Sequence, residues 1–448
     1  MHSTSNAKTA KRDVVKLAKE RGVRFVRLNF ADILGVNKSV TIPVGELERA
    51  MAGKITFDGG SIDGFVRGEE ADMILVPDPG SFAVYPWTEG GEIEARLICD
   101  IATPDGQPFE GCPRSTLKRV LEDARDVGLT LATSVEMEFY LFTQNPDGTP
   151  TTESHDSGSY FDLSPSDRGE DARSAIVAAL EKMGIGVETA HHEHGAGQHE
   201  VDLVATHALK MADHMITFRT LAKHVASQRN LHATFMPKPL EGQAGSGLHI
   251  YFALRDETRN VVGEDTAREG LSDIGLYLVG GLLEHAPAAT AICNPTVNSY
   301  KRLVPNWDAP IYTVWSHRSA NALVRVPFGH GDDARVEMRS PDASCNPYLA
   351  LAVLIESAMH GIRTRKLPGD PWNGTSYDLN ERVRAERGIR VLPKSLRQAL
   401  DELDKDHIVR GALGDHIYHA FREAKLAEYE RYRRAVHPWE RDAYLSLF

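Results

Sequence analysis

The sequence has few cysteines, and none of them forms a close pair. Cys99, Cys112, Cys293 and Cys345 lie far apart, which excludes a CxxC redox dithiol and a zinc ribbon. This usage is typical of a reducing compartment, and we expect a cytoplasmic protein. The sequence also lacks a P-loop and a GxGxxG turn between a strand and a helix, so any nucleotide must be held in another way. No Ser-His-Asp or Cys-His nucleophile pattern stands out.

Positive charge is in short supply as well. The chain has 63 acidic and 51 basic residues, which gives a formal net charge of −12. That balance argues against an extended phosphate-backbone footprint, so we expect no nucleic-acid partner. Residues Met1 to Arg12 lack the apolar segment of a secretory signal, and the longest apolar stretch, Gly275 to Cys293, is interrupted by Glu284 and His285. We expect it to fall short of a membrane span, and we expect no membrane partner.

The remaining composition is that of an ordinary globular protein. Of the 448 residues, 42% are hydrophobic and 25% are charged, which suffices for a large core. Residues Thr103 to Pro113 are rich in Pro and Gly and predict a boundary between an N-terminal domain, 1–105, and a larger domain, 106–448. Strands and helices mix without a regular βαβ alternation, so the predicted fold class is α+β.

Apolar periodicity predicts the individual elements. Helices are expected over Ala7–Glu20, Ser115–Asp126, Asp171–Met183, Ala208–Ser227, Pro347–Arg363 and, in the C-terminal part, about Ser395–Ala435. Strands are expected over Arg24–Phe30, Leu34–Pro43, Arg96–Ile101, Leu129–Phe142, Gly186–Ala190, Leu231–Met236, Gly247–Leu254 and Ala334–Ser340. An extended apolar tail, Val436–Phe448, is expected at the end.

Two predicted strands carry charged side chains on one face. Glu136 and Glu138 alternate with apolar residues, which places the two carboxylates roughly 6–7 Å apart on the same side of a strand. Arg335, Glu337 and Arg339 alternate in the same way. Each pattern also fits a solvated strand face or a surface ion-pair ladder. The functional interpretation is a set of metal ligands flanked by guanidinium groups that bind phosphate or carboxylate.

Further candidate ligands come from glycine turns. The segment His191 to Glu200 holds four histidines together with Glu193 and Glu200, and its glycines predict a tight turn that brings the two acids together. An exposed His-rich turn is the alternative. His249 follows the glycines of Gly245–Gly247 into a strand. Glutamates with one His suit two Mg²⁺ or Mn²⁺ ions, and such ions with arginines favour metal-dependent phosphoryl transfer.

Long runs of the sequence resemble the glutamine synthetase family, in its short bacterial and archaeal type I form. The resemblance extends from Phe25 to Leu447 and is carried by Phe57–Phe65, Val135–Phe139, His191–Glu200, Lys238–His249, Asn294–Leu303, Arg335–Ser340, Asn346–Ala350 and His437–Glu440. It implies a small N-terminal β-grasp-like domain and a large catalytic domain built on a curved antiparallel sheet with flanking helices. It also implies an ATP-dependent ligase that makes γ-glutamyl phosphate from glutamate and transfers the acyl group to ammonia.

The resemblance assigns roles to matching positions. One metal site falls on Glu138, Glu193 and Glu200, and the other on Glu136, His249 and Glu337. Glutamate and its γ-phosphate match Arg302, Arg339 and the backbone of Gly245; the nucleotide matches Arg325, Arg335 and Tyr251; the ammonium pocket matches Asp58, Ser61, Tyr160 and, in the flap, Asp308. Of these, Asp58, Asp308, Arg302 and Arg339 are the predicted catalytic residues.

Several positions depart from the family pattern. Asp308 stands where a Glu is usual, Gly60 replaces a Ser, and Ala244 and Ala320 replace a usual Asn and Arg. All six metal ligands are kept, which favours retained catalysis. Three interpretations stay open: a glutamate–ammonia ligase, a γ-glutamyl-amide ligase that uses an organic primary amine or polyamine, and a non-catalytic glutamine-sensing homologue.

The resemblance also implies an assembly. The tail carries exposed apolar residues such as Trp439 and Phe448, which need a partner surface. In the family this tail inserts into a facing subunit, and two six-membered rings form a dodecamer. We therefore expect a homo-oligomer, a dodecamer of two stacked hexamers, in which the Asp58 loop completes the neighbouring active site.

Overall fold

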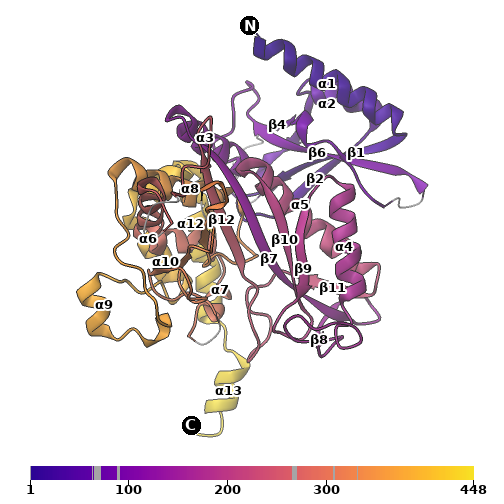
Figure 1. Cartoon of the computed structure of the whole chain (residues 1–448). Helices are drawn as coiled ribbons and strands as arrows, with labels where there is room; N and C mark the ends of the chain where they lie inside the picture. The colour runs from indigo at the N-terminus through magenta and orange to yellow at the C-terminus, as the bar shows by residue number, and fades with distance from the viewer. Residues whose placement is uncertain are drawn as a thin grey trace.

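The computed structural model describes residues 2–62, 64, 72–87, 91–264, 270–305, 308–329 and 331–448. Two sheets organise these residues, one formed before residue 103 and the other after residue 129. The two units lie one above the other, with the N-terminal unit at the top of Figure 1. The α+β class and the division into a smaller and a larger unit therefore agree with the expectation from the sequence.

The N-terminal unit is a small mixed sheet under two helices. Its elements are α1 (His2–Glu20), β1 (Val23–Ala31), β2 (Asn37–Pro43), α2 (Leu47–Met51), β3 (Ile55–Asp58), β4 (Asp72–Pro77), β5 (Ala83–Val84) and β6 (Ile93–Ala102). The strand order is β2-β1-β6-β4-β3, with β5 beside β6 and with β1 and β6 parallel. Buried Val26, Leu28 and Leu97 form part of its own core, which stabilises the unit by removing apolar surface from water.

The larger unit is built on a long, mostly antiparallel sheet. Its strands are β7 (Thr130–Gln144), β8 (Pro150–Ser154), β9 (Val187–His192), β10 (Gln198–His207), β11 (Leu231–Thr234), β12 (Leu248–Arg255), β13 (Trp315–Ser316), β14 (Val324–Arg325) and β15 (Val336–Met338). The order is β13-β14-β15-β12-β7-β10-β9, with β8 and β11 also paired to β7. The short pair β13–β14 is parallel, which makes the sheet mixed at that edge.

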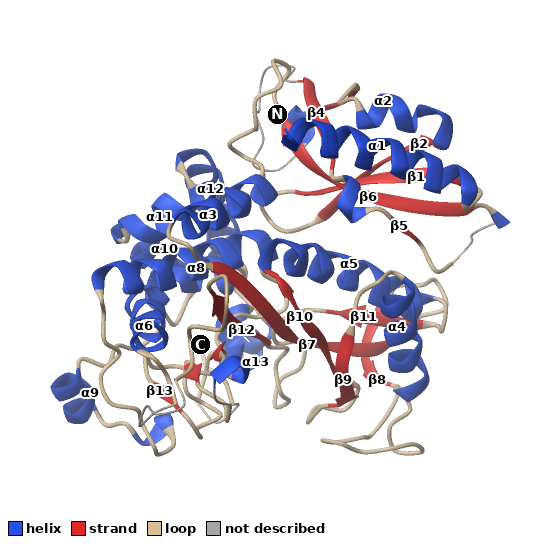
Figure 2. Cartoon of the chain, turned by 45° about the horizontal axis from the view of Figure 1, so that its top comes forward, coloured by secondary structure: helices blue, strands red, loops and turns tan. Residues whose placement is uncertain are grey.

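Helices make up most of the rest of the larger unit. They are α3 (Pro113–Asp126), α4 (Glu170–Lys182), α5 (Ala208–Ser227), α6 (Asp273–Cys293), α7 (Ser299–Arg302), α8 (Pro347–Thr364), α9 (Glu381–Arg387), α10 (Leu396–Lys405), α11 (His407–Leu413), α12 (Asp415–Arg434) and α13 (Pro438–Tyr444). Figure 2 shows α5 running along β7 and β10. Phe139 of β7 meets Phe218 of α5 edge to face at 5.8 Å. The opposite face of β7 is left for the acidic side chains.

Two contacts join the units at α3 and α8. Arg114 of α3 is buried and forms ion pairs with Asp78 and Asp100 of the N-terminal unit and with Asp213 of α5. The left-handed Gly35 (φ +78°) lies against the start of α8, where a Cβ would come within 2.7 Å of the Asn346 Cα. Only glycine fits that approach without displacing backbone.

Helix α6 contains the apolar stretch that the sequence placed short of a membrane span. By length and composition it is sufficient to cross a membrane, so that expectation was too strict. Most of the helix is nevertheless buried inside the protein, between α8 and α10. Pro287 leaves the Leu283 carbonyl without its usual helical donor, and the Arg390 guanidinium donates to that carbonyl at 2.9 Å.

Some predictions of local structure were wrong in part. The helix expected over about Ser395–Ala435 is three helices, α10, α11 and α12, which are separated at Asp406 and Gly414. The strand expected over Ala334–Ser340 is limited to β15, three residues long. The tail expected to be extended contains the short helix α13, because Pro438 occupies its first turn and His437 with Glu440 forms a capping box. Helix α13 projects away from the rest of the chain (Figure 1).

Candidate active site

The central strand β7 presents Glu136 and Glu138 on the side opposite the helices. Val135, Met137 and Phe139, which alternate with these two glutamates, are buried in the core. The alternation that the sequence predicted for this strand is therefore confirmed. Both carboxylates face the region where neighbouring strands add further charged groups.

Register across the sheet gathers the remaining candidate ligands. Glu138 lies opposite Glu200 of β10, and Glu136 lies opposite His249 of β12. Glu337 of β15 lies opposite Tyr251, two residues beyond His249. Four adjacent strands thus deliver five of the six predicted ligands, and Glu193 follows β9 in the turn before β10.

The first cluster consists of Glu136, His249 and Glu337, whose ligand atoms lie within 4.8 Å of one another. His249 Nδ1 lies 2.8 Å from a Glu136 oxygen and 3.6 Å from a Glu337 oxygen. Burial alone raises the pKa of Glu136, but the hydrogen bonds and charge of His249 and the Tyr251 hydroxyl lower it to about 2. Glu337 is fully buried and contacts the Arg325 and Arg339 guanidinium groups. This cluster is anionic and carries its own counter-charges.

The second cluster consists of Glu138, Glu200 and His249, again within 4.8 Å. Burial, opposed by His249 and reinforced by Glu193, raises the pKa of Glu138. Burial and the charge of Glu138 raise the pKa of Glu200 well above its ordinary value. Carboxylates held together in this way stabilise a bound cation, since the cation removes their mutual repulsion. Oxygen-rich donors with one imidazole fit Mg²⁺ or Mn²⁺.

Backbone and amide donors fix the Glu138 carboxylate. The Gly247 amide donates to it at 2.9 Å and Gln198 Nε2 at 2.8 Å. Gln198 also donates to the Gly245 carbonyl at 3.1 Å. Gln198 was not among the predicted site residues, although its spacing of two from Glu200 on β10 was a signal that both lie on one face. His191, whose Nε2 lies 3.1 Å from Glu200, was not predicted as a site residue either.

The buried side chain of Arg302 borders the two clusters of candidate metal ligands. Arg302 donates to the Ser340 carbonyl at 2.8 Å and to the Arg339 carbonyl at 3.2 Å. A Cβ on Gly247 would lie 2.7 Å from the Arg302 guanidinium and 3.0 Å from Glu138. A Cβ on Gly245 would lie 2.5 Å from the Pro237 carbonyl. The two glycines therefore allow the backbone and a buried cation to approach the acidic ligands closely.

An aromatic ring and two arginines form the other border. The Arg335 guanidinium lies over the Tyr251 ring, 4.4 Å from its centroid. The Tyr251 hydroxyl donates to Glu136 and lies 3.4 Å from Arg325 Nη2. Burial raises the pKa of Tyr251, so the hydroxyl keeps its proton. A stacked cation beside the anionic cluster can bind the phosphates of a nucleotide.

The predicted ammonium pocket is dispersed in the single chain. Asp58 ends β3 in the N-terminal sheet and accepts from the Gly60 amide at 2.8 Å. Asp308 is exposed, with a left-handed φ of +53°. Tyr160 is exposed too, and it stacks on His194 at 4.6 Å, next to Glu193. The side chain of Ser61 lies outside the described residues.

Two residues that differ from the family pattern, Ala244 and Ala320, contact the site through their backbone carbonyls. The carbonyl of Ala244 accepts from the Tyr140 hydroxyl at 2.7 Å. The carbonyl of Ala320 accepts from Arg339 Nε at 2.7 Å. Both positions thus help to shape the site through the main chain.

Both units of the chain are similar to known proteins. Residues 22–104 match the family model described as glutamine synthetase, beta-Grasp domain, and residues 110–444 match glutamine synthetase, catalytic domain. A glutamine synthetase of Thermus thermophilus is 45% identical over 443 residues, covering 98% of this chain and 99% of that protein. One of Halobacterium salinarum is 46% identical over 449 residues, covering 100% and 99%. Among solved structures, a chain described as a GmaS/ADP complex superposes with a TM-score of 0.87 at 31% identity, covering 97% and 99%.

Proposed function

The chain belongs to the glutamine synthetase family, and from that premise we propose that it uses ATP to join glutamate and ammonia into glutamine. The single observation that carries this proposal is the convergence of buried glutamates and one histidine from four adjacent strands with Arg325 of β14 and Arg339, which follows β15. Phosphoryl transfer depends on such positioning and charge neutralisation.

The proposed metal sites draw on the two clusters, which share His249, and on Glu193, which belongs to neither cluster. Glu138, Glu193 and Glu200 would hold one cation, and Glu136, His249 and Glu337 the other, as Mg²⁺ or Mn²⁺. The chemistry that bound cations supply there is neutralisation of the transferred phosphoryl group. The family uses ATP and divalent metal, and the oxygen-rich donor set is suited to both ions.

The reaction has two steps. A γ-carboxylate oxygen of glutamate attacks the γ-phosphorus of ATP, the bond to the bridging oxygen breaks, and ADP leaves. Ammonia then attacks the acyl carbon of γ-glutamyl phosphate, and inorganic phosphate leaves. We propose that Arg302 and Arg339 hold glutamate and the transferred group, while the Gly245 backbone binds the glutamate amino group. Asp58 and Asp308 are the proposed carboxylates that attract ammonium and accept its proton.

We propose that the nucleotide binds at the border of the site formed by Tyr251, Arg325 and Arg335. Arg325 and Arg335 provide guanidinium groups for the phosphates, and Tyr251 provides the ring on which Arg335 stacks. Tyr160 and Ser61 are proposed as part of the ammonium pocket. The stack of Tyr160 on His194 places its ring beside Glu193 and so supports that assignment.

A γ-glutamyl-amide ligase acting on an organic primary amine is the second candidate. Gly60 and Asp308 are each smaller than the residue that the family pattern carries. Shorter side chains around an amine pocket leave room for carbon substituents on the nitrogen. The chemistry of both steps is unchanged in this candidate.

Phosphate release from ATP tests both candidates. The assay contains Mg²⁺ and glutamate and compares ammonium with methylamine, ethanolamine and putrescine. Ammonium as the best acceptor supports glutamine formation, and turnover with organic amines alone supports the second candidate. No turnover with any acceptor contradicts both and favours the non-catalytic homologue. The Glu200→Gln variant is the matched control, because it keeps the side-chain shape and removes a ligand charge.

We also propose a homo-oligomer, a dodecamer of two stacked hexamers, in the cytoplasm. Trp439, Leu445 and Phe448 are 65%, 80% and 102% exposed, which leaves an apolar tail without cover in the single chain. The free, buried cysteines suit a reducing compartment. The mass of the native particle, with and without residues 436–448, tests the assembly; a fully active monomer contradicts it.

A further inference from the structure

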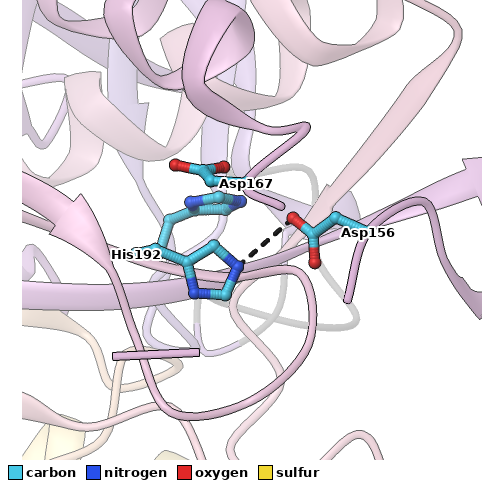
Figure 3. A group of neighbouring side chains, drawn as sticks. Asp156, Asp167 and His192 are labelled. Atoms are coloured by element: carbon cyan, nitrogen blue, oxygen red, sulfur yellow. Dashed lines mark hydrogen bonds and ion pairs between the residues drawn. The ribbon is translucent and has the colours of Figure 1, made fainter. Parts of the chain in front are cut away.

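Behind the turn that carries Glu193 lies a buried group of four side chains. It consists of Asp156, Asp167, His192 and His199, whose ligand atoms lie within 4.8 Å of one another. Figure 3 shows the His192 ring directed at the Asp156 carboxylate, with Asp167 close by. Two histidines and two carboxylates are a possible donor set for zinc, so the role of the group depends on where its protons are.

The hydrogen bonds of His199 and Asp167 argue against a metal in this group. The Arg173 guanidinium lies 2.8 Å from His199 Nδ1 and 2.7 Å from Asp167. A guanidinium only donates, so His199 Nδ1 accepts, and the proton of the neutral ring sits on Nε2. An N–H cannot ligate a metal. Arg173 also supplies the positive charge that balances Asp167.

The pair Asp156–His192 instead connects two points of the turn before β10. His192 Nε2 lies 3.2 Å from one Asp156 oxygen, and His192 Nδ1 lies 2.6 Å from the carbonyl of Glu193. The other Asp156 oxygen accepts from the Gly197 amide at 2.7 Å. One buried carboxylate therefore holds the main chain at both ends of residues 193–197.

This turn sets the position of the one predicted metal ligand that is not on a strand. The Glu193 amide donates to the Gln198 carbonyl, and the Gln198 amide donates to the Gly195 carbonyl, both at 2.8 Å. Gly197 is left-handed, and a Cβ there would lie 2.7 Å from Ser154 Oγ. The turn thus has a defined shape, and its attachment to the sheet interior runs through Asp156.

We propose that Asp156, acting through His192 and the Gly197 amide, is a positioning residue that orients Glu193 toward the cation on the glutamate side. This inference rests on the proposed function for the identity of that cation site. Asp156 contacts neither a predicted ligand side chain nor the substrate positions. Its effect on the metal is exerted through the main chain of residues 193–197.

Binding of Mn²⁺ to the full-length protein without ATP or glutamate is the test. Free Mn²⁺ is counted by electron paramagnetic resonance for the parent, Asp156→Ala and Asp156→Asn. We expect Asp156→Ala to weaken one class of Mn²⁺ sites about tenfold, the scale found when support of a ligand is removed. Asp156→Asn still accepts from the Gly197 amide, so a smaller loss in the same direction is expected. Asp147→Ala is the matched control, because Asp147 makes local contacts to Thr149 in the turn between β7 and β8.

Hydrogen exchange of the metal-free variants gives a readout that does not need turnover. Peptides covering 193–198 should exchange faster in Asp156→Ala than in Asp147→Ala, whereas peptides of β12 should not change. If Asp156→Ala fails to fold, Asp156→Asn decides by the same two measurements. Parent-like Mn²⁺ affinity and parent-like exchange in a folded variant would overturn the proposal. A parent that binds Mn²⁺ but turns over no acceptor contradicts the proposed function while this comparison still stands.

Discussion

Replacement of Arg114 by Met removes a buried cation that links the two units. Arg114 is 3% exposed and donates through Nε and Nη2 to both oxygens of Asp213 at 2.9 Å, through Nη1 to Asp100 at 2.9 Å and through Nη2 to Asp78 at 2.6 Å. Asp213 also accepts from the Tyr348 hydroxyl at 2.7 Å, so its carboxylate cannot turn away freely. Methionine fills similar space but leaves Asp213 and Asp78 without the guanidinium, whereas Asp100 keeps its ion pair with Lys118.

The expected loss is about 3–5 kcal/mol, the range for breaking a buried ion pair on one side. Most of it should come from Asp213, whose side chain is 9% exposed, because Asp78 at 31% and Asp100 at 20% are partly screened by water. Since the stranded charge is the cause, Asp213→Asn added to Arg114→Met should recover part of the loss. Arg114→Lys should lie between, as lysine lacks the two-point geometry.

Urea unfolding measures these differences. Protomer concentration must be held fixed, because assembly contributes to the apparent free energy of unfolding. Circular dichroism and tryptophan fluorescence should be followed together, since separate transitions would reveal that the N-terminal unit detaches first. A midpoint for Arg114→Met that equals the parent, or a double variant no more stable than the single one, would refute the reasoning.

Three further predictions concern pH, metal and nucleotide. Burial lowers the pKa of His214 to about 4. As the pH falls below ~6.5, the unfolded chain therefore binds a proton at His214 before the folded chain does, and the folded state loses stability. Between about pH 7.5 and about pH 5.5, the free energy of unfolding in urea should fall by about 1 kcal/mol more for the parent than for His214→Gln. Glu200→Gln removes a charge that Glu138 repels, so the metal-free variant should melt above the parent, whereas added Mg²⁺ should stabilise only the parent; a lower melting temperature of the metal-free variant would contradict this. Tyr251→Phe keeps the ring under Arg335 and should change KM for ATP less than Tyr251→Ala, and equal KM values for the two would show that the stack is irrelevant.

Local patterns predicted the strands and helices that have strong periodicity. The helix expected over Ala208–Ser227 has those bounds in α5, and the strand expected over Leu129–Phe142 is β7 within two residues at either end. Helix α13 was missed because the apolar residues of the tail masked a capping signal that depends on His437 and Glu440. Local hydrogen bonds of the capping box determine the structure of this segment, whereas the prediction of an extended tail was based on its apolar residues.

The candidate metal ligands could be predicted from the sequence, but the residues that hold those ligands in position could not. Charged residues that alternate on strands, such as Glu136 and Glu138, are visible along the sequence. Asp156 carries no such signal, because its partner Gly197 is 41 positions away and contributes only a backbone amide. Contacts of that kind depend on the register of β9 and β10, which the sequence does not reveal.

The distribution of the metal ligands along the chain has a consequence for biogenesis. Residues from Glu136 to Glu337 must be brought to one place by strands β7, β10, β12 and β15, so no shorter stretch of the chain can form both clusters. A nascent or proteolysed chain that lacks β15 lacks Glu337 and with it one of the three ligands of the first cluster. Occupation of both clusters therefore reports completed synthesis and folding of the catalytic unit, and fragments that lack Glu337 should not consume ATP.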